Sequence, residues 1–595
     1  MIIILFYDFE VFKEDWLVVV IDMVKKEEHT IINDAAALEK LHKENINNIW
    51  VGFNSRHYDQ WILKGILCGF DPKKINDYII EKEQPGWKFS SLFRNIQLNN
   101  YDVMNATDRG LKFFEGSMGN DIKESSVPFD IQRKLTPDEL AETVKYCKHD
   151  VEQTIQVFLQ RKEDFEAHLG LVKIACQGKP LDLSLISKTK AQLSAFILEA
   201  HQQPHDDEFD IDFPETMRIK KYQSVVDWYK NPENRCYVRH IPGKKTLEKV
   251  QLDIMVAGVP HQFGYGGVHG AIPQYHGEGY FLNMDVASLY PSLMIQYNLH
   301  SRNMADPKKY EEIYHQRLKF KKEKNPLQAP LKLVLNSTYG VMKDKNNALC
   351  DERQANRVCV YGQLLLLDLI EHLEPYCEII QSNTDGVLIK MPDNVPADIW
   401  YKSKEEKEAA WFNIIDDIAF EWEQRTHLQL EFEEYRKVYQ KDVNNYIIVD
   451  GNGKYKSKGA YVKKLSNLDY DLPIINKALI EYMVHGVPVE KTINECDDLK
   501  EFQLISKISS KYDCILHGDK VLKERCIRIF ASTDENDAGV QKVHAVTKRP
   551  AKISNSPLHC FIFNEDVNGV KVPSKLDKSW YIELAKKRLQ DFGVL

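Results

Sequence analysis

Acidic side chains recur in this chain at spacings that place them together on one face of a strand or helix. In FYDFEVF, Asp8 and Glu10 lie two residues apart on an expected strand, so both side chains leave the same face. In YCKHDVEQT, Tyr146 and Asp150 lie four apart on an expected helix, again on one face. Together with Asp59 they supply the several oxygen ligands that two Mg²⁺ ions bridging a phosphodiester require.

A second acidic set lies further along the chain. FLNMDVASLYPSLMIQYNL predicts a strand that runs into Asp285, followed by a helix that opens at Ser288. Such a strand-to-helix turn exposes backbone N–H groups, which suits a triphosphate beside a carboxylate-bound metal. QSNTDGVLIK predicts a β-hairpin with Asp385 at its tip. A lone Asp at a hairpin tip is most often turn chemistry, so its meaning depends on what surrounds it.

The residues between these two aspartates predict a pair of basic helices. EEIYHQRLKFKKEKNP carries Arg317 and Lys321 at i, i+4. After the turn at 325–326, LKLVLNSTYG carries Lys332, Asn336 and Tyr339 at i, i+4, i+7, which is one stripe along a helix. If the helices are antiparallel and face each other, the three cations form a phosphate clamp.

The ordered motifs resemble two families of nucleic-acid enzymes. D-x-E, then N-x-x-x-Y-D, then Y-x-x-x-D resembles the three motifs of the ribonuclease-H-like 3′–5′ exonuclease domains attached to DNA polymerases, over about residues 1–165. D-x-x-S-L-Y-P-S, R-x-x-x-K, K-x-x-x-N-S-x-Y-G and T-D-G resemble the polymerase core of family B DNA polymerases. Together the resemblance covers at least residues 1–460 and is closest to the compact bacteriophage type.

The resemblance implies a role for each matching residue. Two Mg²⁺ ions per active site, or Mn²⁺ in their place, would be held in the polymerase site by Asp285, Val286 and Asp385 and in the exonuclease site by Asp8, Glu10, Asp59 and Asp150. Tyr146 would orient the attacking water, and Lys123 matches an auxiliary lysine of that domain. The incoming nucleotide would be bound by Ser288, Leu289, Tyr290, Arg317, Lys321, Lys332, Asn336 and Tyr339. DNA would be contacted by Asn54, Tyr58, Tyr265, Gly266, Gly267, Tyr446, Lys456, Lys458 and Gly459.

The DNA contacts outside the predicted exonuclease domain fall on two elements of the predicted palm. FGYGGVHGAI resembles the Y-x-G-G loop between exonuclease and polymerase, with its middle residue missing, and a plain interdomain turn is the alternative. KYKSKGAY resembles the basic strand that grips the primer–template. We favour Tyr446 over Tyr439 as the tyrosine of the neighbouring K-x-Y element, because NNYIIV predicts a strand pairing with GKYKSKG. Asn444 then stands where the family has Lys, and Lys441 is expected to compensate.

The implied fold is α+β and multidomain: a ribonuclease-H-like α/β exonuclease domain plus a right-hand polymerase with an antiparallel palm sheet, helical fingers and a thumb. The expected divisions are an exonuclease domain at 1–165, a linker or connecting region at 166–260, palm at 261–300 and 341–464, fingers at 301–340, and a thumb at 465–595. The last division rests on position alone. The acidic, Pro-bearing stretch 201–215 predicts a linker or surface excursion.

Composition sets outer limits on the function. The chain has 595 residues, 43% apolar and 28% charged, which is ordinary for a globular protein of several domains. Net charge is −9, yet residues 301–345 carry 11 Lys/Arg against 5 Asp/Glu and residues 436–464 carry 8 against 2, which favours a polyanion path. The 11 cysteines form no C-x-x-C pair. We expect no signal peptide, no membrane partner, and an intracellular protein in the cytoplasm of a host cell.

The expected partners are primer–template DNA, dNTPs and a single-stranded 3′ end in the exonuclease site, bound by a monomer. Protein-primed phage polymerases carry insertions between the motifs, whereas 47 positions separate Asp285 from Lys332 here and 49 separate Asn336 from Asp385. We therefore expect no terminal-protein primer.

Two other functions stay open from the sequence. One is an active exonuclease whose polymerase half only binds DNA, and the other is a structural nucleic-acid-binding protein. Asn383 is relevant to both alternatives, because the family usually has a second Asp at this position. The Asn removes one negative charge beside the metals. With Asp285 and Asp385 retained, we interpret Asn383 as a tolerated variant.

Overall fold

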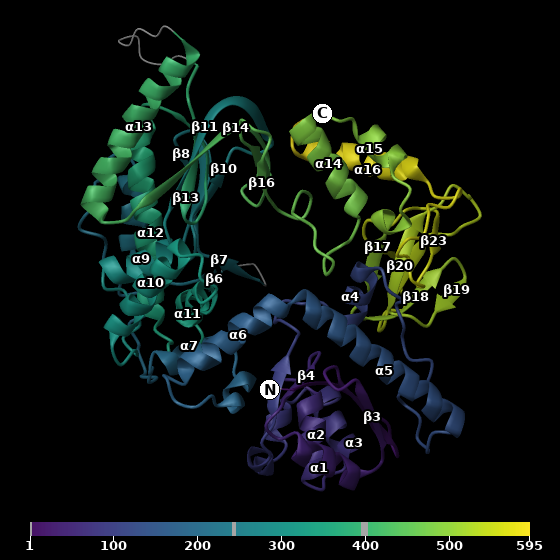
Figure 1. The fold of residues 1–595 in the computed structure, drawn as a ribbon. Coiled ribbons are helices and arrows are strands. Elements are labelled where there is room, and N and C mark those ends of the chain that lie inside the picture. Colours follow the sequence, from purple (N-terminus) through teal and green to yellow (C-terminus); the bar gives the residue numbers. More distant parts are fainter. Residues whose placement is uncertain (1–2, 241–245, 394–402, 595) are drawn as a thin grey trace. The chain divides into compact units, whose positions relative to one another are not determined.

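The computed structural model describes residues 3–240, 246–393 and 403–594, and its chain forms two compact units of mixed α and β structure (Figure 1). The first unit comprises Met1–Thr189, Leu465–Ile474 and Ile493–Tyr581, and the second comprises Lys190–Lys464, Ile475–Thr492 and Ile582–Leu595. The mixed α and β, multidomain architecture is confirmed. The finer six-part division stays a prediction, and residues 465–595 contribute to both units.

The first unit is built on a five-stranded sheet of order β3-β2-β1-β4-β5. Its strands are β1 (Ile4–Val11), β2 (Trp16–Asp22), β3 (Glu27–Ile32), β4 (Ile49–Gly52) and β5 (Asn99–Asp102). The first three pair antiparallel, whereas β4 runs parallel to both β1 and β5. Apolar side chains of β1 such as Leu5, Tyr7 and Phe9 are buried in the sheet core, as the strand pattern predicts.

Helices cover this sheet and connect its strands. α1 (Ala35–Glu44) follows β3, α2 (Asp59–Leu67) and α3 (Pro72–Ile80) follow β4, and α4 (Leu111–Met118) follows β5. α5 (Pro137–Gln160) begins with a capping box between Thr136 and Glu139.

The expected helix that carries Tyr146 and Asp150 is α5, which ends at Gln160. Arg161 has φ −111°, and α6 (Lys162–Ala175) starts after it. The Arg161 guanidinium is paired with Asp108 and donates a 2.7 Å hydrogen bond to the Val103 carbonyl oxygen. These tertiary contacts hold Arg161 outside helical geometry, so periodicity alone could not locate the break. The short helices η3 (Leu183–Ser187) and then α7 (Lys190–Ile197) lead into the second unit.

The later part of the first unit holds two small antiparallel sheets. One has the order β17-β20-β23, from Leu504–Lys507, Cys526–Ala531 and Cys560–Ile562. The other has the order β19-β18-β21-β22, from Lys520–Leu522, Tyr512–His517, Val540–His544 and Pro550–Lys552. α4 packs against β17 and β20, where the fully buried Arg528 donates hydrogen bonds to the Asn120 and Glu565 carbonyl oxygens at 2.8 and 2.6 Å.

The second unit is built on a nine-stranded antiparallel sheet of order β16-β15-β14-β11-β13-β12-β10-β9-β8. Its strands, in chain order, are β8 (Leu252–Val256), β9 (Val259–Phe263), β10 (His269–Ala271), β11 (Tyr275–Val286), β12 (Glu378–Ser382), β13 (Gly386–Lys390), β14 (Leu430–Asp442), β15 (Asn445–Val449) and β16 (Tyr455–Lys458). The central strands bury an apolar core around Phe281, Ile380, Leu388 and Val438. The predicted pairing of NNYIIV with GKYKSKG is confirmed, with Tyr446 opposite Lys458.

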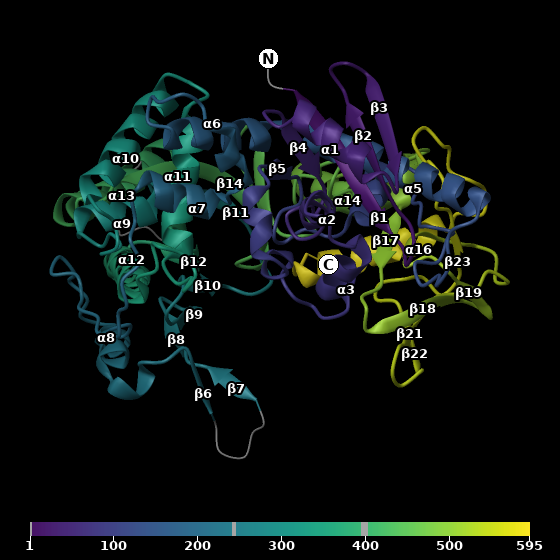
Figure 2. The same ribbon diagram turned by 90° about the horizontal axis from the view of Figure 1, so that it is seen from below.

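Helices pack against this sheet and beside it. They are α8 (Gln223–Lys230), α9 (Leu289–Gln296), α10 (Pro307–Lys322), α11 (Gln328–Val341), α12 (Glu352–Leu373) and α13 (Lys404–Thr426). α10 and α11 are neighbours, as the sequence predicts, and α12 is buried along most of its length. Near α8, β6 (Val238–His240) and β7 (Leu247–Lys249) form a hairpin that extends away from the sheet (Figure 2). α14 (Pro473–His485), α15 (Val489–Glu495) and α16 (Lys578–Asp591) complete the element order.

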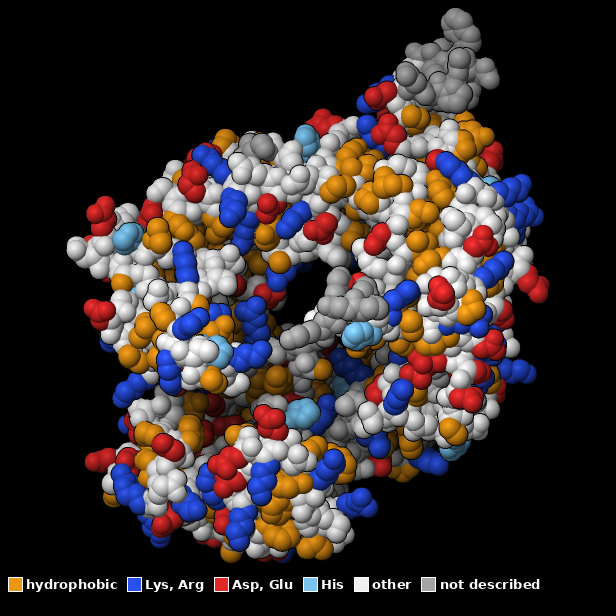
Figure 3. Space-filling view, turned by 180° about the vertical axis from the view of Figure 1, so that it is seen from behind, with side chains coloured by type: hydrophobic (Ala, Val, Ile, Leu, Met, Phe, Trp, Pro, Cys, Tyr) orange, Lys and Arg blue, Asp and Glu red, His pale blue; other side chains and the backbone are white. Residues whose placement is uncertain are grey.

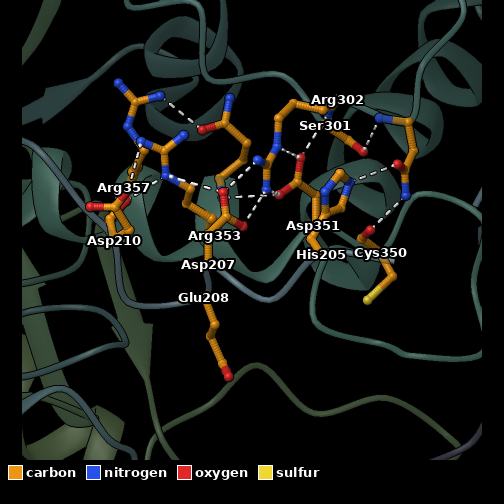
Figure 4. Close-up of polar contacts among 12 residues, drawn as sticks. His205, Asp207, Glu208, Asp210, Ser301, Arg302, Cys350, Asp351, Arg353 and Arg357 are labelled. Atoms are coloured by element: carbon orange, nitrogen blue, oxygen red, sulfur yellow. Dashed lines mark hydrogen bonds and ion pairs between the residues drawn. The ribbon is translucent and has the colours of Figure 1, made fainter. Parts of the chain in front are cut away.

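The acidic stretch predicted as a linker is tied to the second unit by ion pairs (Figure 4). Asp207 accepts two hydrogen bonds from the Arg302 guanidinium, at 2.6 and 2.9 Å. Asp212 is bound in the same bidentate way by Arg357 of α12, at 2.6 and 2.8 Å. Arg302 also donates to the buried Asp351 at 2.7 Å. The stretch therefore lies at the surface, as predicted, with Asp212 exposed, and two of its carboxylates are paired with arginines of the second unit.

On the face shown in Figure 3, basic and acidic side chains are interspersed. Across the described ranges, every helix is too short or too polar to pass through a bilayer.

Candidate functional site

The carboxylates of the first motif set lie on three elements that meet at the central strand of the first unit. Asp8 and Glu10 lie on the same face of β1, with Phe9 buried on the other. Asp59 begins α2 and accepts a 3.1 Å hydrogen bond from the Phe9 N–H, which fixes α2 against β1. α5 packs on β1 as well, and Cys147 donates a 3.3 Å hydrogen bond to the Asp8 carbonyl oxygen.

These carboxylates line one pocket of about 660 Å³, together with Asp150. Asn54 and Tyr58, the predicted DNA contacts, line it too. The Tyr58 hydroxyl donates to the Asn76 side chain at 2.7 Å, which fixes the ring at the pocket wall. The structure therefore brings six of the predicted exonuclease residues together in one cavity, whereas Tyr146 and Lys123 are not among its lining residues.

Burial and mutual repulsion dominate the electrostatics of this pocket. Burial, then the neighbouring carboxylates, raises the pKa of Asp8 and of Glu10 well above the ordinary value. Burial raises the pKa of Asp59 to about 7 and that of Asp150 to about 6. Desolvation disfavours the charged form of each acid, and a bound cation would restore it. The donor set of several hard oxygens fits Mg²⁺ or Mn²⁺.

The site also holds a lysine that the sequence motifs did not identify. Lys112 of α4 is buried, forms an ion pair with Asp150, and lies 3.0 Å from Glu115. Its Nζ is 4.6 Å from the centroid of the Tyr146 ring. Lys123, the predicted auxiliary lysine, has a side chain that is 57% exposed and pairs with Asp121 at 3.8 Å. The sequence does contain a signal for Lys112, because it lies inside the apolar run GLKFFEG. A lysine on a buried helix face requires an acidic partner.

The second pair of aspartates meets across the sheet of the second unit. Asp285 is opposite Gly386 in the β11–β13 ladder, and Asp385 is at the tip that joins β12 to β13. The Val286 N–H donates a 2.7 Å hydrogen bond to the Asp385 carbonyl oxygen. Asn383 closes the tip through its N–H, which donates to the Gly386 carbonyl oxygen at 2.8 Å. The hairpin thus holds Asp385 beside Asp285 through backbone hydrogen bonds, and the Asn383 Oδ1 accepts a further 3.0 Å hydrogen bond from the Thr384 N–H.

A pocket of about 220 Å³ lies at this pair of aspartates, and most of its lining is polar. The lining residues are Asn283, Asp285, Gln381, Asn383, Asp385, Gly386, Leu388, Tyr446, Ile448 and Lys456. Burial and the Asp385 charge raise the pKa of Asp285 to about 6. Oxygen donors again predominate, so the site fits a hard divalent cation.

Three polar residues near this pocket have no counterpart in the predicted set. The Asn283 amide donates to Asp285 at 2.7 Å, and the buried Gln381 lines the cavity. Glu433 of β14 is opposite Asn283 and pairs with Lys456 at 2.5 Å. A carboxylate therefore lies near Asp285 even though the hairpin has Asn383. These contacts depend on strand register between distant segments, so motif spacing alone does not reveal them.

The predicted nucleotide residues are brought together in part. Arg317 of α10 is buried and donates a 3.0 Å hydrogen bond to Ser288, which begins α9 with φ 52°. Within the described residues the Arg317 Nε is buried without a hydrogen-bond partner. Tyr290 and Tyr339 stack with ring centroids 4.0 Å apart. These contacts gather α9, α10 and α11 into one corner.

The remaining nucleotide and DNA residues are distributed around that corner. Leu289 is buried, Lys332 and Asn336 are exposed on α11, and Lys321 lies 3.8 Å from Glu431. Gly459 has φ 97°, and a Cβ there would lie 2.3 Å from the Asn445 side chain, so the turn after β16 requires glycine. Lys441, expected to compensate for Asn444, points instead to the Tyr461 ring at 4.7 Å and to Asp591 at 4.0 Å.

Comparison with known proteins leaves the family unassigned. No protein-family model matches the chain, and no curated protein matches it. Among solved structures, the family B DNA polymerase from the hyperthermophilic archaeon Pyrobaculum calidifontis is similar at a TM-score of 0.40 and 13% identity, over 100% of this chain and 78% of that one. This likeness is too weak to assign a function, which has to come from the two carboxylate sites themselves.

Proposed function

We propose that this protein is a template-directed DNA polymerase that adds dNTPs to a primer 3′-OH by two-metal phosphoryl transfer and proofreads with a 3′–5′ exonuclease. The observation that carries the proposal is the paired site of the second unit. There, two aspartates meet at a hairpin tip in the unit that also gathers a buried arginine and two stacked tyrosines. Phosphoryl transfer requires mainly positioning and charge neutralisation, and these residue types supply both.

Asp285 and Asp385 would hold the metals of the polymerase site. Bound Mg²⁺ would neutralise charge on the nucleotide phosphates and lower the pKa of the primer hydroxyl. The Arg317 guanidinium would bind a phosphate oxygen, and Lys321 and Lys332 would add cationic contacts from α10 and α11. Tyr290, stacked on Tyr339, would exclude a ribose 2′-OH by bulk.

Asp8, Glu10, Asp59 and Asp150 would hold the metals of the exonuclease site. The mixed five-stranded sheet with Asp8 and Glu10 on its central strand supports a ribonuclease-H-like domain. Lys112 would orient Asp150 and stabilise negative charge on the scissile phosphate, and Tyr146 would position the attacking water. Asn54 and Tyr58 would contact the single-stranded 3′ end.

The wider biological assignment follows from the resemblance and the motif spacing. We infer a monomeric family B enzyme of the compact bacteriophage type, which replicates a viral genome inside the host cell from an ordinary primer. A nucleotide linked covalently to a protein at a genome end, made by this enzyme, would contradict the absence of terminal-protein priming.

Templated incorporation tests the proposal. A labelled primer on a template should gain a single nucleotide only when the dNTP complementary to the templating base is supplied with Mg²⁺. Asp385→Asn should abolish incorporation, whereas the matched control Glu378→Gln, on the exposed start of the same hairpin, should not. Wild-type protein that shortens the primer but never extends it would favour an exonuclease with a DNA-binding polymerase half. Binding without either reaction would favour a structural role.

A further inference from the structure

The segment Gly264–Val268, called here the glycine loop, joins β9 to β10 in the second unit. Gly266 is exposed at its apex, and a Cβ there would meet no neighbouring atom. Within the described part of the chain, neither the Gly266 nor the Gly267 N–H donates a hydrogen bond. Unused backbone N–H groups can donate to a phosphate oxygen, and glycine lets a nucleic-acid backbone approach them closely. Gly266 is exposed and Gly267 is half-buried, whereas Gly264, Tyr265 and Val268 are buried.

A single buried amide holds the inner side of the glycine loop. Gln363 of α12 is 2% exposed, and its Nε2 donates to the Gly264 and Gly266 carbonyl oxygens at 2.7 and 2.6 Å. Its Oε1 accepts from the Gly264 N–H at 3.3 Å and from the Tyr229 hydroxyl at 2.9 Å. Both ends of the amide are thus used to fix the backbone on each side of Tyr265.

The same loop touches the hairpin that carries Asp385. A Cβ on Gly267 would lie 2.5 Å from the Thr384 Oγ1, so the Gly267 backbone packs directly on the residue before Asp385. β10, which follows the loop, pairs with β12, which leads into the hairpin. The glycine loop is therefore held between α12 and the hairpin tip.

Aromatic packing holds the glycine loop from the side. The Tyr265 ring lies 5.0 Å from Phe209 and 5.8 Å from Tyr229, measured between centroids. Lys343, just beyond the end of α11, donates to the Tyr265 carbonyl oxygen at 2.9 Å. Gln363 is the contact that reaches the glycines on both sides of Tyr265, so we expect its loss to loosen the loop as a whole.

We propose that Gln363 is a positioning residue that fixes the glycine loop both for nucleic-acid phosphate binding at Gly266–Gly267 and for the placement of Asp385 through Thr384. The inference rests on the proposed polymerase function. It predicts that one buried amide, which contacts neither metal nor nucleotide, affects binding of the primer–template and the rate of extension together.

The test compares two glutamines of the same helix. Gln363→Leu removes the amide that holds the glycine loop. Gln354→Leu is the matched control, because Gln354 is 5% exposed on α12 and donates to the His300 carbonyl oxygen at 3.0 Å, away from the loop. Both variants lose buried hydrogen bonds and should lower Tm to a similar extent. Gln363→Leu should raise KM for primer–template about tenfold and lower kcat, since a small misplacement of reacting groups is costly. Gln354→Leu should keep both constants within about twofold, as expected for a site that is not coupled to the reaction.

If Gln363→Leu folds poorly, Gly267→Ala and the double variant Gly267→Ala/Thr384→Ala test the same contact between the glycine loop and the hairpin. Gly267→Ala should lower kcat because its methyl group pushes Thr384, and adding Thr384→Ala should recover most of the loss, since the nearest remaining atom would be the Thr384 Cβ at 3.2 Å. Degradation of a single-stranded 3′ end should be unchanged in every variant. Equal kinetics for Gln363→Leu and Gln354→Leu, or wild-type kcat for Gly267→Ala, would overturn the inference. Failure of wild-type protein to extend any primer would overturn the proposed function instead.

Discussion

Gly386 faces Asp285 across the β11–β13 ladder, and alanine at this position perturbs the polymerase site without removing any polar group. A Cβ on Gly386 would lie 2.0 Å from the Asp285 Oδ1 and 2.8 Å from the Met284 carbonyl oxygen. Carbon and oxygen atoms do not pack closer than about 3 Å, so the carboxylate has to retreat by about 1 Å. A shift of that size at a catalytic group costs about 100-fold in rate, or about 2.7 kcal/mol of barrier.

The assay for Gly386→Ala is steady-state primer extension, with kcat measured at saturating dNTP. Gly386 lies in β13 with no positive φ, so its φ suits alanine, which is favoured over glycine in a strand by about 0.5–1 kcal/mol, although the Met284 carbonyl oxygen also has to move slightly. The matched control is Gly451→Ala, in the turn between β15 and β16, where the nearest atom to the new Cβ would be Arg436 Cγ at 3.8 Å. Folded Gly386→Ala protein that extends at the rate of wild type would refute the placement of Asp285 at the reaction centre.

Three further predictions follow from the contacts of individual residues. Lys112→Met should lower exonuclease kcat at least tenfold and reduce the free energy of unfolding by about 3 kcal/mol, because it leaves Glu115 and Asp150 buried without their cation. Lys123→Met should change neither quantity. Nuclease assays and urea unfolding in which Lys123→Met has these effects and Lys112→Met has none would contradict the role of Lys112. The pKa of Asp285 is raised to about 6 from 3.8, so the Asp285 carboxyl of the metal-free folded protein binds its proton more tightly than in the unfolded chain. This carboxyl therefore lowers the free energy of unfolding as the pH rises from about 4 to about 6. Asp285→Asn should therefore gain up to about 3 kcal/mol of unfolding free energy over wild type between pH 4 and pH 7 in EDTA; a gain that does not depend on pH would contradict the buried carboxyl. Asn383→Asp should leave extension within a few fold of wild type, and an inert wild-type enzyme that becomes active with this change would show that Asn383 is not tolerated.

The local arrangement of each site follows closely from the sequence. The i, i+2 spacing of Asp8 and Glu10 on a strand places both on one face, and the structure has them on one face of β1. The alternation of NNYIIV and GKYKSKG predicts the β15–β16 pair. These features depend on residues close in sequence, where side-chain direction is set by the element itself.

What spacing could not predict depends on tertiary contacts. Lys112 and Lys123 both follow β5, and only the packing of α4 against α5 decides which one reaches Asp150. Glu433 reaches the polymerase site because β14 pairs with β11 in one particular register, and a shift of one residue would turn it to the other face. The composition of 201–215 predicts a linker or surface excursion, but it does not reveal that Asp207 and Asp212 pair with arginines distant in sequence.

One gel tests the central claim that the chain holds two separate metal-dependent active sites. A 5′-labelled primer on a longer template is incubated with Mg²⁺, with and without dNTPs, for wild type, Asp385→Ala and Asp8→Ala. Wild type should lengthen the primer with dNTPs and shorten it without them. Asp385→Ala should lose only the lengthening, and Asp8→Ala only the shortening. Unimpaired extension by Asp385→Ala, or loss of both reactions from either single change, would contradict the account.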